Sequence, residues 1–199
     1  MTNVSRTNMN GHRPSSDLYS TPHEATHPFV LFELERLRAA VANDAIWEPA
    51  AGEGWVAQVL EIHGFNVIES DKYVHHRQRN QPVEQADFFE QWFLRAPVIV
   101  TNPPYKCVNA FIRHALMLEP RYAAFLLPIT FLAGKKRRDL REGVIGGCKL
   151  ARVLTLEFRV TLKPTHLKLE NTGVVTYAWF VWERGHQGPS VNYGLARAA

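Results

Sequence analysis

The residues with the clearest chemical potential are Asn102-Pro103-Pro104-Tyr105. Two consecutive prolines fix the backbone and remove two N–H donors, so the Asn102 amide oxygen and a neighbouring carbonyl can point outward as acceptors. Two acceptors at a rigid turn can hold an NH2 group and direct its nitrogen lone pair toward an electrophile, while the Tyr105 ring can stack on a base. The pattern predicts a loop for chemistry on an exocyclic amino group, and the alternative is a rigid turn after a strand.

A second candidate site is the segment 48–54, Glu-Pro-Ala-Ala-Gly-Glu-Gly, between a predicted strand and a predicted helix. Its glycines allow a tight turn and close approach to a ligand. The third glycine of a dinucleotide fingerprint is missing, which disfavours a pyrophosphate cradle and leaves a simple packing turn as the alternative. Glu69 and Asp71 end the next predicted strand at about the spacing of a ribose-binding carboxylate. Asp71 is the first choice, and a solvated carboxylate is the alternative.

Basic residues gather in two segments. One cluster consists of Lys135, Lys136, Arg137 and Arg138, followed by Arg141. It could neutralise several phosphates of a nucleic acid, or it could be a solvated helix face, and both interpretations stay open. The segment 158–171 is either a DNA contact or a plain loop, and it contains Arg159, Lys163, His166 and Lys168.

The elements that must position these residues alternate along the chain. Apolar patterns predict strands at 45–47, 65–68, 98–100, 122–127, 153–158 and 174–182. Between them, helices are predicted at 27–41, opening after Thr26 as its N-cap, and at 55–63, 110–118 and 134–142. Such alternation predicts a parallel sheet with helices on both faces, whose ligands bind beyond the carboxyl ends of the strands. The candidate loops should therefore meet at that edge.

Composition predicts one folded domain. The chain has 199 residues, 46% hydrophobic residues and a net charge of +4, which is compatible with a polyanionic partner without requiring one. Apolar runs stop well short of the roughly 20 residues of a membrane span. We expect a flexible arm at 1–16, one domain at 17–185, a tail at 186–199 and a cytoplasmic location. Cys107 and Cys148 are expected to be reduced structural thiols rather than a disulfide or metal site.

The proline motif, downstream of the glycine segment, resembles the paired catalytic and cofactor motifs of the N6-adenine DNA methyltransferase family. Tyr19-Ser20-Thr21-Pro22 is similar to the family's N-terminal cofactor-contacting segment, and residues 86–89, Ala-Asp-Phe-Phe, to the segment that holds the cofactor's adenine. Residues 126–138 and 177–182 resemble later segments of small phage- and prophage-associated members. The resemblance covers roughly residues 17–185.

This resemblance implies a Rossmann-like class I methyltransferase fold, α/β, with a mostly parallel seven-stranded sheet, an antiparallel last strand and helices on both faces. It implies S-adenosylmethionine as cofactor and no metal. The implied cofactor residues are Thr21, Glu48, Pro49, Ala50, Gly52, Gly54, Asp71, Asp87, Phe88 and Asn102. Asn102, Pro103, Pro104 and Tyr105 are the implied catalytic residues. The expected substrate contacts are Tyr105, Phe131 (with Phe158 as a second apolar wall), Lys135, Lys136, Arg137 and Arg138.

The chain departs from the family in having no room for a separate target-recognition domain. We therefore expect the chain to bind nucleic acid, either together with a separate specificity subunit or as a homo-oligomer. Adenine N6 in DNA is the leading acceptor, and adenine in RNA and a glutamine amide in protein are alternatives because the same loop chemistry serves all three. A catalytically silent binding module is an alternative of another class.

Overall fold

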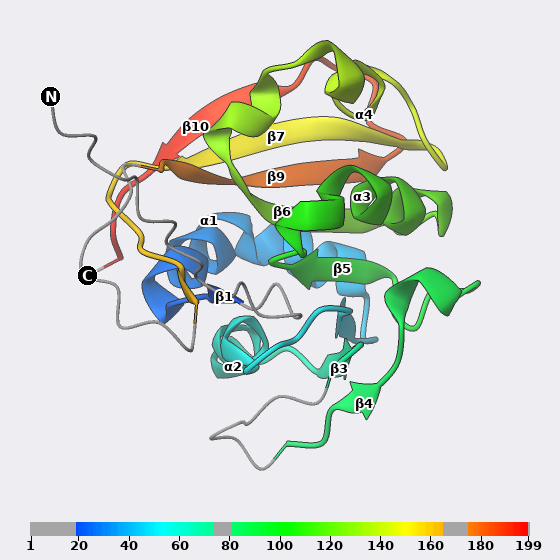
Figure 1. Ribbon diagram of the computed structural model, residues 1–199, viewed down its shortest axis with the longest axis vertical. Coiled ribbons are helices and arrows are strands. Elements are labelled where there is room, and N and C mark those ends of the chain that lie inside the picture. The colour runs from blue at the N-terminus through cyan, green and yellow to red at the C-terminus, as the bar shows by residue number, and fades with distance from the viewer. Residues whose placement is uncertain (1–18, 74–80, 165–174, 199) are drawn as a thin grey trace, which may run out of the picture.

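The computed structural model describes residues 19–73, 81–164 and 175–198. Its centre is an eight-stranded sheet in the order β10-β7-β9-β6-β5-β2-β3-β4, with helices on both sides (Figure 1). The predicted arm at 1–16 and the predicted contacts His166 and Lys168 lie outside the described residues. Arg159 is exposed, and Lys163 belongs to a short strand, β8.

The elements have the following bounds. The helices are α1 (His23–Val41), α2 (Trp55–Ile62), α3 (Val108–Met117) and α4 (Arg138–Glu142), with short 3-10 turns η1 (Phe88–Glu90), η2 (Tyr105–Cys107), η3 (Ile129–Leu132) and η4 (Lys135–Arg137). The large sheet contains β2 (Ile46–Glu48), β3 (Val67–Asp71), β4 (Glu84–Gln85), β5 (Val98–Thr101), β6 (Tyr122–Pro128), β7 (Cys148–Leu156), β9 (Tyr177–Arg184) and β10 (Val191–Leu195). A separate antiparallel pair joins β1 (Tyr19–Ser20) to β8 (Lys163–Pro164).

The α/β architecture is confirmed, with one correction to the strand count. Strand β9 runs antiparallel to β6 and β7, as expected for the strand predicted at 174–182, and the other neighbouring strands of the large sheet are parallel. The sheet has eight strands rather than seven. Residues 191–195, which the sequence placed in a tail, form β10 and pair with β7 because alternate backbone groups of β7 would otherwise lack partners.

Two apolar cores fill the space between the sheet and its helices. One lies under α1 and α2 and the other under α3 and α4, so both faces of the sheet are covered as predicted. Helix α1 begins at His23, four residues before the predicted start, and the predicted cap Thr26 is buried inside it. Tertiary contacts hold this first turn: the Trp179 indole donates to the Ala25 carbonyl at 2.8 Å, and Phe29 stacks on Trp179.

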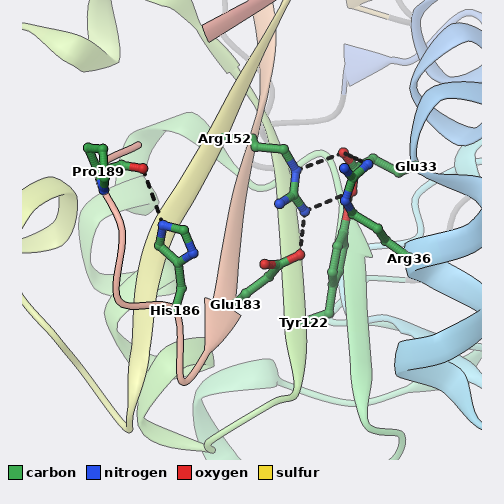
Figure 2. A network of polar contacts seen from close by, with 7 residues as sticks. All are labelled: Glu33, Arg36, Tyr122, Arg152, Glu183, His186 and Pro189. Atoms are coloured by element: carbon green, nitrogen blue, oxygen red, sulfur yellow. Dashed lines mark hydrogen bonds and ion pairs between the residues drawn. The ribbon is translucent and has the colours of Figure 1, made fainter. Parts of the chain in front are cut away.

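A buried ionic network fastens α1 to the sheet. Arg152 of β7 donates two hydrogen bonds of 2.8 Å to Glu33 of α1 and a third to Glu183 of β9 (Figure 2). The Tyr122 hydroxyl donates to Glu33 at 3.2 Å, and burial raises the pKa of Tyr122 well above its ordinary value. The network therefore fixes the helix that directly follows the site-forming segment Ser20-Thr21.

Candidate active site

A cavity of about 250 Å³ lies beyond the carboxyl ends of β2, β3 and β5. These strands run in parallel, so the segments that follow them share one edge of the sheet. Most of the predicted cofactor residues line this cavity: Thr21, Glu48, Pro49, Ala50, Gly52, Asp71, Asp87, Phe88 and Asn102. Pro103 and Pro104 line it as well.

The glycine segment turns around the end of β3. Gly52 and Gly54 have positive φ angles of 51° and 83°, which side chains other than glycine rarely adopt. The Gly52 N–H donates to the Asp71 carboxylate at 2.8 Å, and the Ala51 N–H donates to the Ser70 carbonyl at 3.1 Å. Gly54 does not line the cavity; it is the N-cap of α2, and its N–H donates to the Ala51 carbonyl. Its role is to make the turn.

Two buried carboxylates face the cavity from neighbouring strands. Glu48 Oε2 accepts from the Ala57 N–H in the first turn of α2 at 2.8 Å. Asp71 Oδ1 accepts from the Tyr73 N–H at 2.9 Å, in addition to the bond from Gly52. A carboxylate has about four acceptor positions and can accept from several donors at once. Glu69 is also buried but does not line the cavity, which favours Asp71 over Glu69.

An ion pair spans one wall of the cavity. Lys72 Nζ lies 2.7 Å from Asp87 Oδ2, and Asp87 Oδ1 accepts from the Phe89 N–H at 3.0 Å. Burial by itself would raise the pKa of Asp87, but the hydrogen bonds from Lys72 and Phe89 outweigh it and lower the pKa below its ordinary value. Asp87 is therefore an ionised acceptor beside the aromatic rings of Phe88 and Phe89.

Asn102 presents an acceptor that nothing else in the described chain uses. Its Nδ2 donates to Thr21 Oγ1 at 2.9 Å, joining segments 81 positions apart in the sequence. Its Oδ1 is buried without a hydrogen-bond partner among the described residues. Other described residues also have a buried side-chain atom without a hydrogen-bond partner. Within the described ranges, only Asn102 Oδ1 among these atoms belongs to a residue that lines the cavity. Leaving such an atom unpaired costs about 1–3 kcal/mol, so its presence points to a donor on a ligand.

Tyr105 lies beside the cavity rather than in its lining. Its hydroxyl donates to the Leu126 carbonyl at 3.3 Å, and its ring is nearly parallel to that of Tyr177, with 6.4 Å between centroids and 22° between planes. The motif is thus divided: Asn102, Pro103 and Pro104 face the cavity, while Tyr105 faces the start of β9. Tyr177 was predicted only as part of a strand.

The structure does not bring the remaining predicted substrate residues to the cavity. Phe131 is only 2% exposed and packs edge-on against Phe180 and Trp182, so it cannot serve as an apolar wall for a base. Phe158 packs against the other core, with Arg197 over its ring. Both predictions used the aromatic residue type alone, which does not distinguish a core ring from a binding surface.

The predicted basic cluster lies on η4 and the start of α4, outside the cavity lining. Lys135 and Lys136 are exposed, Arg137 lies over the Phe131 ring, and Arg138 pairs with Glu142 at 2.6 Å. Contact with a nucleic acid stays a prediction for this surface.

Neither Cys107 nor Cys148 forms a disulfide. Cys148 is buried and donates to the Pro120 carbonyl, and burial raises the pKa of its thiol to about 11. Cys107, in contrast, lines the cavity.

Sequence reasoning also missed several cavity residues. The main ones are Trp55, Lys72, Tyr73 and Lys106. Most are immediate sequence neighbours of predicted residues, and that adjacency was the signal that could have found them. Which neighbours point into the cavity depends on local turns, as with Trp55, whose indole donates to Glu53 at 2.7 Å.

The sequence matches no protein-family model and no curated protein. Among the described residues, no helix is both long and apolar enough to cross a membrane.

Solved structures have the same fold. One, described as a modification subunit of a type I restriction enzyme from Vibrio vulnificus YJ016, is 14% identical with a TM-score of 0.53, and the match covers 89% of this chain and 47% of that one. A class I S-adenosylmethionine-dependent methyltransferase from Listeria monocytogenes is 11% identical with a TM-score of 0.55, covering 87% and 66%. A protein described as an RNA methyltransferase from Pyrococcus horikoshii is 16% identical with a TM-score of 0.61, covering 87% and 91%.

This chain thus spans about half the length of the Vibrio subunit and about two thirds of the Listeria protein. At these identities the likeness establishes the fold, which is the Rossmann-like fold of class I methyltransferases.

Proposed function

We propose that this chain transfers a methyl group from S-adenosylmethionine to an exocyclic amino group, with adenine N6 in DNA as the acceptor. The observation that carries the proposal is the buried, unpartnered Oδ1 of Asn102 at the cavity wall. An amide oxygen there can accept from an N–H or O–H donor, and a rigid Asn-Pro-Pro turn suits an amino group held for attack. A catalytically silent module would have no need of such an acceptor.

The cavity residues fit the cofactor. Asp71 has acceptor positions for the hydroxyls of a ribose, and Asp87 has them for an adenine amino group beside the rings of Phe88 and Phe89. The Glu48 carboxylate and the glycine segment would hold the amino-acid part of the molecule. When bound, S-adenosylmethionine would supply an electrophilic methyl group on a sulfonium, a centre that needs no covalent help from the protein.

The residues of the chain would act mainly by positioning the amino group and the base that carries it. Asn102 Oδ1 and the Pro103 carbonyl would accept the two amino hydrogens, which orients the nitrogen lone pair toward the cavity. Thr21, hydrogen-bonded to Asn102 Nδ2, would hold the amide in this orientation. Tyr105 would stack on the base from outside the cofactor cavity. Holding two reactants in line can supply a large part of a rate enhancement.

DNA is favoured as acceptor by the resemblance of the motifs, by the modification subunit among the structural neighbours and by the exposed basic cluster. RNA adenine is the second candidate, because the neighbour described as an RNA methyltransferase is matched over 91% of its own length. A specificity subunit would be the partner that supplies a recognition sequence to the DNA-directed enzyme.

The deciding experiment measures transfer of labelled methyl from the cofactor to unmethylated DNA, RNA and protein in parallel, followed by nucleoside and amino-acid analysis. Labelled N6-methyladenine in DNA is expected, with Asn102→Ala as a control that binds the cofactor but transfers the methyl group about 10² to 10³ times more slowly. Label only in RNA or protein would replace the acceptor and keep the chemistry of the loop. Cofactor binding without transfer to any of the three would refute the proposal.

A further inference from the structure

The two edges of the large sheet differ in how they are protected. At one edge, β4 is two residues long and exposed, and Glu84 pairs there with Arg95. At the other edge, β10 is five residues long and contains no charged residue or proline. Its Val191 and Tyr193 are 42% and 40% exposed. Short or charged edges prevent strand addition, whereas a longer uncharged edge invites it.

The backbone of β10 has pairing groups on its outer side. The Leu195 carbonyl accepts from the Glu157 N–H, so Leu195 points its backbone groups toward β7. Backbone groups alternate along a strand, so those of Val191 and Tyr193 also point inward, and those of Asn192 and Gly194 point outward. Within the part of the chain that the structure describes, no strand pairs with this outer side.

We infer that β10 pairs antiparallel with β10 of a second copy of this chain, with the two Tyr193 residues opposite each other at the two-fold axis. In this register Asn192 faces Gly194 of the second copy, and each such pair exchanges two backbone hydrogen bonds. This register uses the backbone groups of Asn192 and Gly194 for hydrogen bonding, and these are the groups that point outward. The Tyr193 residues then occupy the non-hydrogen-bonded position, where the Cα atoms are about 4.5 Å apart.

The side chains are complementary in the same register. On the face toward α1, Tyr193 contacts Phe32 with 5.1 Å between ring centroids, and both rings are partly exposed. Val191 would lie opposite Leu195 of the second copy, which extends the apolar core under α1 across the two-fold axis. Because the dimer is symmetric, the exposed apolar surface of Phe32, Val191 and Tyr193 is buried in both copies.

On the opposite face, Glu157 lies over Gly194, where a Cβ would collide with its carboxylate. Residues directly opposite in an antiparallel pair share a face, so the Asn192 amide of the second copy would lie beside this carboxylate and could donate to it. Gly194, which lies under the Glu157 carboxylate, is thus opposite Asn192 of the second copy. Strand β10 lies at the opposite end of the sheet order from β2, β3 and β5 (Figure 1). Pairing of the two β10 strands therefore leaves the cavity of each copy open.

Cross-linking tests the register. Tyr193→Cys should form an intermolecular disulfide under mild oxidation, because two cysteines at a non-hydrogen-bonded antiparallel pair meet the distance requirement. Val191→Cys is the matched control: it lies on the same strand but faces Leu195, roughly four residues from its own counterpart, and should not cross-link. The wild-type chain, with Cys107 and Cys148 present, gives the background.

Sedimentation velocity over a range of protein concentrations tests the dimer itself. The wild-type chain should show a mass of twice 22.7 kDa. Asn192→Pro removes an outward N–H without touching the ladder with β7, so it should weaken association roughly 10- to 100-fold. Val144→Lys, at an apolar position away from β10 that is 63% exposed, is the control for surface changes and should remain dimeric. A monomeric wild-type chain, a dimer unaffected by Asn192→Pro, or equal cross-linking of the two cysteine variants would overturn the inference.

Discussion

Replacing Arg152 with methionine should destabilise the fold far more than breaking any surface ion pair. Glu33 is fully buried and the Arg152 side chain is 9% exposed, so the substitution leaves a carboxylate without its main partner in the interior. Burial lowers the pKa of Arg152, but hydrogen bonds to Glu183 and Glu33 outweigh it, and the pKa is raised above its ordinary value. The guanidinium is therefore charged at every accessible pH, and its removal is the removal of a charge.

The size of the effect follows from this geometry. Two opposite unit charges about 4 Å apart attract by about 4 kcal/mol at an effective dielectric constant of about 20. Removing one partner of a buried pair typically costs about 3–5 kcal/mol, because the other charge stays desolvated. Arg36 lies 3.6 Å from Glu33 but is half exposed, so it compensates little. In a chain of this size the loss corresponds to a drop in Tm of roughly 6–20 °C.

Urea unfolding followed by tryptophan fluorescence can measure this, since Trp47, Trp179 and Trp182 are fully buried. Arg184→Met is the matched control: it removes the pair with Glu119, whose side chains are 50% and 53% exposed, and should cost less than about 1 kcal/mol. Adding Glu33→Met to Arg152→Met should recover most of the stability, because no buried charge then remains unpaired at Glu33. Equal losses in the two arginine variants, or no recovery in the double variant, would refute the reasoning.

Two further predictions concern the cavity, and a third concerns the basic cluster outside it. Asp71→Asn should weaken S-adenosylmethionine binding roughly 10- to 150-fold in calorimetry, since hydrogen bonds to charged groups contribute about 1.5–3 kcal/mol, whereas Glu69→Gln should bind normally; the reverse pattern would move the ribose contact to Glu69. Asn102→Ala should lower single-turnover methyl transfer by about 10² to 10³ with cofactor affinity retained, and Asn102→Asp, which keeps an acceptor, should lose less; near-wild-type transfer by the alanine variant would exclude the loop from catalysis. Alanine at all four positions 135–138 should weaken binding to every DNA sequence and reduce the salt slope by about 0.9 for each phosphate that these side chains neutralise, and an unchanged slope would make the cluster a solvated surface.

Local sequence patterns were sufficient for the order of the main elements. Runs of apolar residues between turn signals located β2, β3, β5 and β6 within a few residues, because strand and helix periodicity is a property of neighbouring positions. The glycine segment was recognisable for the same reason: the positive φ angles at Gly52 and Gly54 favour glycine at the level of the single residue. Parallel alternation then placed the loops after these strands at one edge, which is where the cavity lies.

The boundaries of α1 and β10 could not be read in this way. Helix α1 lacks a side-chain cap at its start and contains Pro28 in its second turn, and contacts with Trp179 from the far end of the chain stabilise its beginning. Strand β10 is short, and four of its five residues are exposed, so its sequence resembles that of a tail until β7 supplies a partner. Pairing is a non-local interaction and leaves little trace in five residues.

The sequence by itself determined which residues could do chemistry, since an Asn-Pro-Pro turn and a strand-end carboxylate are defined by residue type and spacing. Only the tertiary structure decided what each of them faces. In the folded chain Asn102 lies at the cavity and its Nδ2 donates to Thr21. The Tyr105 ring lies against Tyr177, and Phe131 is buried in the core. The direction of a side chain depends on packing between segments far apart in the chain, and no local pattern encodes that packing.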